Sequence, residues 1–278
     1  MISEPDYKGN IVHFSGFKID SEAAFDFSPK EYSKFKHGAE NIARKFGYEL
    51  AERFINGVFR HTYNGEQLIV VPSAYSHIPT ASFYMTKYFI NRINSYLFDN
   101  GYPVVQVTKI HRTVTYREDY AGMSAESRYK LISGDKFYID KEFVKGKKMI
   151  FIDDIKITGT HERIITKMLS EHGITEDSYM IYFAELTNHA INPNIENYLN
   201  NYFVKGIDDI SKIIDEDDFT FNTRVVKYIL NRKPEEFDSF INKQTDEFKH
   251  SLYHNAVGNE FYKFETYLRN LNKLKLIL

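Results

Sequence analysis

Cysteine and tryptophan are absent from this chain of 278 residues. Without cysteine there can be no disulfide, no zinc–thiolate site and no thiol nucleophile, which suits a reducing compartment, and we expect a cytoplasmic protein. Charge of one sign is not in excess, because the formal net charge is −2; this argues against a nucleic-acid partner bound by bulk positive charge. No apolar run approaches the roughly 20 residues of a membrane span, so no membrane partner is expected.

Short apolar runs alternate with stretches of helical spacing in the middle of the chain. Runs at 68–71, 104–107, 149–152 and 179–186 predict buried strands. Apolar residues between 78 and 97 recur with helical spacing. Such alternation predicts an α/β fold, with a mostly parallel sheet flanked by helices.

Both ends of the chain are expected to be helical additions to this sheet. Residues 1–60 are predicted to form a helical N-terminal extension, because Ser28 and Pro29 together are a helix-start signal. Residues 61–187 are predicted to form the α/β core. Residues 188–278 lack strand patterns and predict a helical C-terminal region packed on that core.

The third predicted strand leads directly into two acids and a small-residue loop. Asp153 and Asp154 follow the apolar run, and residues 158–160 read Thr-Gly-Thr where a helix should begin. In open parallel sheets ligands bind beyond the carboxyl ends of the strands, and a helix N-terminus attracts anions. Acids would repel a bare phosphate but suit sugar hydroxyls or a metal ion. The combination therefore predicts a site for a ribose phosphate.

This stretch resembles the phosphoribosyl-pyrophosphate signature of type I phosphoribosyltransferases. Two upstream segments, 111–113 (His-Arg-Thr) and 123–128 (Met-Ser-Ala-Glu-Ser-Arg), resemble the Arg-Thr and Leu-Ser-x-x-x-Arg elements of the ComF-like branch. Residues 68–73 resemble the strand before that family's pyrophosphate loop. The resemblance covers about residues 68–186 and implies the type I phosphoribosyltransferase fold.

The resemblance also implies a reaction and a set of residues. Ribose phosphate would pass from phosphoribosyl pyrophosphate to a nitrogenous acceptor, with Mg²⁺ as cofactor and release of pyrophosphate. The implied catalytic residues are Asp153, Asp154, Arg112 and Arg128, and the two aspartates would also hold the metal. The implied ligand-binding residues are Ser73, Ala74, Tyr75 and Ser76 around the pyrophosphate and Ile157, Thr158, Gly159, Thr160 and His161 around the 5′-phosphate. Residues 109–128 would form a hood, a nucleoside monophosphate is a possible ligand, and a homodimer is a possible assembly.

Two positions depart from the family pattern and leave alternatives open. Ile157 stands where many members carry a hydroxyl or an acid, so it cannot act on an acceptor base. His161 replaces a small hydroxyl residue, and its charge would depend on pH. A non-catalytic nucleotide-binding sensor or interaction protein is therefore the alternative. A metal hydrolase with an acid pair is a third, although Ile155 and Lys156 stand where its second acid would be. The acceptor, the oligomeric state and the role of the C-terminal region stay open.

Overall fold

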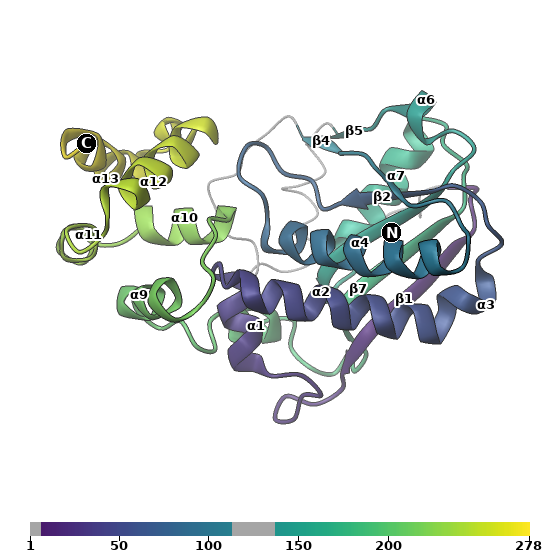
Figure 1. The fold of residues 1–278 in the computed structure, drawn as a ribbon. Coiled ribbons are helices and arrows are strands. Elements are labelled where there is room, and N and C mark those ends of the chain that lie inside the picture. Colours follow the sequence, from purple (N-terminus) through teal and green to yellow (C-terminus); the bar gives the residue numbers. More distant parts are fainter. Residues whose placement is uncertain (1–6, 113–136) are drawn as a thin grey trace.

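A parallel sheet organises the larger part of the molecule, and the C-terminal helices lie to one side of it (Figure 1). The computed structural model describes residues 7–112 and 137–278. The five-stranded sheet has the order β1-β7-β6-β2-β3, and all its pairings are parallel. The strands are β1 (Ile11–Ile19), β2 (Leu68–Pro72), β3 (Gln106–Val107), β6 (Lys148–Lys156) and β7 (Ser178–Leu186). The predicted α/β class, with a mostly parallel sheet flanked by helices, is confirmed.

Both faces of the sheet are buried, which explains why its central strands are almost continuously apolar. In β2, Leu68 and Val70 pack into one core cluster, whereas Ile69 and Val71 pack into another. Helices α2 (Glu40–Phe54) and α4 (Ala81–Asp99) cover the first face. Helix α7 (Thr160–Glu171) lies behind the sheet in Figure 1 and covers the second face, together with α6 (Lys141–Val144).

The N-terminal segment differs from its prediction. Residues 1–60 were expected to be helical, but β1 is an edge strand of the main sheet, paired in parallel with β7. The expectation is wrong for these residues because an edge strand, which has only one pairing neighbour, is less uniformly apolar than a central one. Helices follow it as expected, in the order α1 (Pro29–Lys36), α2, the π-helical turn η1 (Ile55–Phe59) and α3 (Arg60–Thr62).

Helix boundaries follow the local signals of the sequence. Ser28 caps α1 by accepting a hydrogen bond from the Glu31 N–H at 3.2 Å, and Pro29 occupies its first turn. Thr80 caps α4 in the same way. Helix α7 begins after Gly159, which has φ +67°, and ends before Gly173, which has φ +61°. Both glycines adopt the left-handed conformation that other residues rarely adopt.

The C-terminal region is helical, as predicted, and extends the core of the sheet. Its elements are α8 (Ile195–Asn200), α9 (Ile207–Glu216), α10 (Thr223–Leu230), α11 (Pro234–Ile241), α12 (Asp246–Gly258), the 3-10 turn η3 (Phe261–Lys263) and α13 (Glu265–Leu276). One hydrophobic cluster runs from the sheet into these helices. No helix in the described part of the chain combines the length and apolar content needed to cross a membrane.

Candidate functional site

A cavity of about 860 Å³ lies at the carboxyl ends of β2 and β6. This volume falls in the range of about 300–1,000 Å³ that is usual for small-molecule sites. Its floor is formed by the loops after both strands and the start of α7, and its far wall by α10 and the segments around 259 and 267. The predicted residues that line it are Ser73, Ala74, Tyr75, Ser76, Asp153, Asp154, Ile157, Thr158, Gly159, Thr160 and His161.

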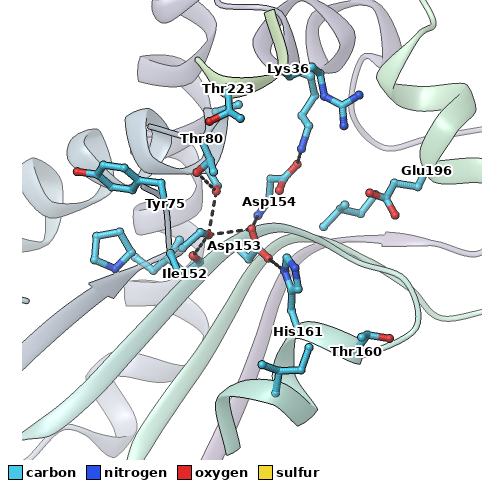
Figure 2. A pocket seen from close by; sticks show the side chains of 18 of the residues that line it. Lys36, Tyr75, Thr80, Ile152, Asp153, Asp154, Thr160, His161, Glu196 and Thr223 are labelled. Atoms are coloured by element: carbon cyan, nitrogen blue, oxygen red, sulfur yellow. Dashed lines mark hydrogen bonds and ion pairs between the residues drawn. The ribbon is translucent and has the colours of Figure 1, made fainter. Parts of the chain in front are cut away.

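Asp153 lies between the two loops that follow β2 and β6 (Figure 2). Its Oδ2 is 2.8 Å from Nδ1 of His161, and its Oδ1 accepts a hydrogen bond from the Ser73 hydroxyl at 3.0 Å. Burial by itself raises the pKa of Asp153. The hydrogen bond and charge of His161, together with the charge of Lys36, lower this pKa by more than burial raises it. The net result is a pKa well below the usual range, so Asp153 is a carboxylate at physiological pH.

Asp154 points away from Asp153, toward helix α1 (Figure 2). Its Oδ2 accepts a hydrogen bond from the Tyr32 hydroxyl at 2.6 Å and forms an ion pair with the Lys36 ammonium. Only 6% of Asp154 is exposed. Burial, and secondly the charge of Asp154, raise the pKa of Tyr32 well above its usual value, so Tyr32 stays a donor. The two acids therefore have different surroundings: Asp153 contacts Ser73 and His161, and Asp154 contacts Tyr32 and Lys36.

The loop between β6 and α7 has the form expected of an anion site. The N-cap position of α7 is Gly159, which has no side chain to accept hydrogen bonds from the first N–H groups of the helix. The hydroxyls of Thr158 and Thr160 are 2.9 Å apart. Ile157 is only 7% exposed and packs in the main core. The N–H groups and hydroxyls beside Gly159 offer donors to a phosphate.

A chain of hydroxyl groups supports the loop after β2. The Thr80 and Ser82 hydroxyls are 2.9 Å apart, and Ser82 donates to the Ser73 hydroxyl at 2.9 Å. In the same loop, Tyr75 lies under the Lys109 ammonium, which is 3.8 Å from the ring centroid. The Lys109 ammonium also donates to the Ser76 carbonyl at 3.0 Å. These contacts position the loop next to Asp153.

Asn259, at the end of α12, anchors the same loop from the C-terminal region. Its side-chain oxygen accepts hydrogen bonds from the backbone N–H groups of His77 and Ile78, each at 3.1 Å. Only 3% of Asn259 is exposed. The Thr223 hydroxyl donates to the Ile78 carbonyl at 2.8 Å. The C-terminal helices therefore form part of the site and set the position of this loop.

Replacing Asn259 with alanine is expected to lower the free energy of unfolding by about 1–3 kcal/mol, the cost of leaving buried donors unpaired. It should also weaken phosphate-ligand binding, because the N–H groups of His77 and Ile78 lose their acceptor. Urea unfolding and calorimetry would measure the two effects. Asn255→Ala is the matched control, because the Asn255 side chain donates to the Ser251 carbonyl of its own helix. Equal stability of the two variants would contradict this role of Asn259.

Several residues of the cavity were not expected from the sequence. Lys36 comes from α1, and Thr223, Arg224 and Lys227 come from α10. Tyr32, also from α1, lies behind the cavity and bonds Asp154. A signal for α10 was present, because residues 223–232 contain three cations and no acid. The pairing of Lys36 with Asp154 could not be predicted from local sequence, because the two residues are 118 positions apart.

The predicted hood lies mostly outside the described residues. Arg128 belongs to the segment 113–136, so the structure does not place it. Arg112 lies in the short strand β4 (His111–Arg112), which pairs antiparallel with β5 (Phe137–Tyr138). The two arginines therefore stay predictions as catalytic residues.

The arrangement of the carboxylates limits how a Mg²⁺ ion could be held. Among residues 7–112 and 137–278, no three Asp, Glu or His side chains gather as an all-protein metal site would require. Mg²⁺ is commonly held instead by one or two carboxylates together with waters and substrate phosphates. Asp153 and Asp154 are hard oxygen donors next to the proposed phosphate loops. Asp153, beside the loop after β2, fits a metal that arrives with a phosphorylated ligand, whereas Asp154 points toward α1 and is already paired with Lys36.

This chain is similar in sequence to a known protein family. The profile of a family described as "PRTase ComF-like" matches residues 12–274. A search of curated proteins finds no match. A hypoxanthine phosphoribosyltransferase structure from Staphylococcus aureus is 15% identical over 54% of this chain and 75% of that chain, with a TM-score of 0.33. One from Trypanosoma cruzi, in complex with the product IMP, is 14% identical over 53% and 68%, with a TM-score of 0.32. Sequence identities and TM-scores this low support no conclusion about the residues of the site.

Proposed function

The chain belongs to the ComF-like family of phosphoribosyltransferases, and from this premise we propose that its cavity binds phosphoribosyl pyrophosphate together with Mg²⁺. In the proposed reaction the bond between C1 of the ribose and the pyrophosphate oxygen breaks, and its electron pair leaves with pyrophosphate. A nitrogen atom of the acceptor forms the new bond to C1 and then releases its proton. Mg²⁺, when bound, would supply positive charge near the departing pyrophosphate.

One observation supports this function above the others. A charged carboxylate, Asp153, and the uncapped helix start at Gly159 line the same cavity. The carboxylate suits hydroxyl groups, whereas the helix start suits a phosphate, and a ribose 5-phosphate carries both. Asp153 would accept from a ribose hydroxyl, and the N–H groups from Gly159 to His161 would surround the 5′-phosphate. The loop 73–76 would face the pyrophosphate.

Replacing Asp153 with asparagine is expected to weaken binding of phosphoribosyl pyrophosphate about 10- to 100-fold, since a hydrogen bond to a charged group contributes about 1.5–3 kcal/mol. Calorimetry with phosphoribosyl pyrophosphate and MgCl₂ would measure the dissociation constant. Asp208→Asn, an exposed acid on α9, is the control and should bind like the wild type. Unchanged affinity of the Asp153 variant would refute the proposed site. Thermal melting would show that the variant is folded.

A non-catalytic role is a second candidate, and the surroundings of Asp154 favour it. The Lys36 ammonium is already paired with Asp154, and Ile157 is buried where an acid or hydroxyl would face the acceptor. Release of pyrophosphate separates the two functions. An enzyme would release it in the presence of one acceptor of a panel of bases. A sensor would bind phosphoribosyl pyrophosphate or a nucleoside monophosphate without turnover.

A further inference from the structure

Helix α7 carries an acid at the third position of its first turn. Gly159 is the N-cap residue, and Glu162 follows it by three positions. An acid at this position commonly folds back and accepts a hydrogen bond from the N–H of the N-cap residue. Such a bond would occupy a donor at the helix start where the 5′-phosphate is proposed to bind. The direction of the Glu162 carboxylate therefore decides what this helix start can bind.

Helices α9 and α11 show the common arrangement. At the start of α9, Oδ2 of Asp209 accepts a hydrogen bond from the N–H of Gly206 at 3.2 Å. At the start of α11, Oε2 of Glu236 accepts one from the N–H of Lys233 at 3.3 Å. Gly206 is a glycine N-cap, as Gly159 is. A glycine N-cap followed by an acid at the third position is thus sufficient to close a helix start in this chain.

Glu162 is directed toward the sheet instead. Its Oε1 is 2.7 Å from Nε2 of His13 on β1. Its Oε2 is 2.8 Å from the Lys156 ammonium at the end of β6 and accepts a hydrogen bond from the Tyr182 hydroxyl on β7 at 2.9 Å. His13, Lys156 and Tyr182 are called the three strand donors below. They engage both oxygens of the carboxylate from three different strands.

Two of the strand donors are themselves held by further contacts. The Lys156 ammonium is also 3.3 Å from Oε1 of Glu185, and Oε2 of Glu185 accepts a hydrogen bond from the Ser15 hydroxyl at 2.6 Å. Tyr182 is only 5% exposed. Burial, and secondly the charge of Glu162, raise the pKa of Tyr182 well above its usual value, so its hydroxyl keeps its proton. Both groups are therefore fixed donors to Glu162.

The held carboxylate is charged and close to the proposed phosphate site. Burial by itself raises the pKa of Glu162, but the hydrogen bonds and charges of His13 and Lys156 lower it by more, to about 2. Glu162, Lys156 and Tyr182 all line the cavity. A carboxylate accepts hydrogen bonds and donates none, as a phosphate dianion does. If it turned to the helix start, it would compete with a phosphate for the same N–H groups and repel it.

We propose that the three strand donors are positioning residues for the 5′-phosphate, because they hold the Glu162 carboxylate away from the start of α7. This inference rests on the proposed function, since it concerns the phosphate end of the same cavity. Without these donors, Glu162 would turn to the N–H of Gly159. The helix would then close its own start, as α9 does, and would bind a phosphate poorly.

Releasing Glu162 from the sheet tests the inference. The variant Lys156→Met/Tyr182→Phe removes both donors to Oε2. Calorimetry should show that it binds phosphoribosyl pyrophosphate, in the presence of MgCl₂, about tenfold more weakly than the wild type, because a charged acceptor now competes for the N–H groups. Adding Glu162→Ala should restore the wild-type affinity, since the competitor is gone. Lys167→Met, which removes a lysine of α7 that pairs with Glu171, is the control and should bind like the wild type.

A second release acts on the other oxygen and disturbs the core less. The side chain of His13 is 44% exposed, so His13→Ala should melt close to the wild-type temperature. It should weaken binding of phosphoribosyl pyrophosphate in the same direction, and His13→Ala/Glu162→Ala should again bind like the wild type. This pair of variants gives the result if Lys156→Met/Tyr182→Phe does not fold.

The outcomes that contradict the inference differ from those that contradict the proposed function. If Glu162→Ala failed to restore affinity, the strand donors would act on the ligand directly, and the inference would be wrong. Unchanged affinity after release of Glu162 would also overturn it, because the carboxylate would then not compete. In both cases the wild type still binds phosphoribosyl pyrophosphate. A folded wild type that binds none would refute the proposed function, and the positioning role with it.

Discussion

Replacing Asp154 with alanine is expected to lower the free energy of unfolding by about 3–5 kcal/mol, because it leaves a buried charge without its partner. Asp154 is 6% exposed, and the side chain of Lys36 is 12% exposed. The variant would leave the Lys36 ammonium and the Tyr32 hydroxyl without their common acceptor. Urea unfolding followed by circular dichroism would measure the loss.

A double variant separates this cost from a general effect of mutating the strand end. Lys36→Met together with Asp154→Leu removes both charges, and apolar replacement of a buried ion pair is often neutral or stabilising. We therefore expect the double variant to recover most of the lost stability, although not ligand binding. If Asp154→Ala unfolded at the wild-type urea concentration, Lys36 would have to reach water, and the buried pair would not exist.

Replacing Phe183 with alanine is expected to lower the free energy of unfolding by about 3–5 kcal/mol, the usual cost of removing a buried aromatic ring. Phe183 lies on β7 with no exposed surface. Its ring centroid is 4.2 Å from that of Phe46 on α2 and 4.9 Å from that of Phe17 on β1. The ring therefore joins the edge strand, the central sheet and the covering helix.

The matched control for this prediction is Phe98→Ala on α4. Phe98 is 77% exposed, so its removal takes little apolar surface out of the core. Its effect should be within about 0.5 kcal/mol, as is usual for surface substitutions. Urea unfolding of both variants gives the comparison. A loss at Phe183 no larger than that at Phe98 would mean that β1 and α2 do not depend on this contact.

The sequence predicted best the strands that lie at the centre of the sheet. β2, β6 and β7 are paired or covered on every side, so nearly every residue in them must be apolar, and a local run of Val, Ile and Phe is sufficient to find them. Strands at the sheet edges were less readable. The run 104–107 was predicted to be a buried strand, but it forms only the two-residue strand β3. Val104, before that strand, is 52% exposed, and Val107, within it, is 50% exposed.

β1 was missed although its sequence contains a partial strand pattern. Val12, Phe14, Phe17 and Ile19 are apolar, but Gly16 interrupts their alternation. Within residues 7–112 and 137–278 it pairs with β7 alone, and Ile11 lies opposite Ser178 in that pairing. Pairing between segments so far apart depends on the packing of everything between them, which a local window of sequence cannot represent.

The sequence by itself determined the sugar-phosphate end of the candidate site. Asp153, Asp154 and Gly159 lie within seven consecutive positions, so the geometry of one strand, one turn and one helix start brings them together. Only the tertiary structure decided what surrounds them. Lys36 reaches Asp154 across 118 positions, and Asn259 reaches His77 across 182. Contacts of this kind follow from how the N- and C-terminal helices bury their apolar faces on the sheet, because that packing, and no local pattern, selects which polar side chains face the cavity.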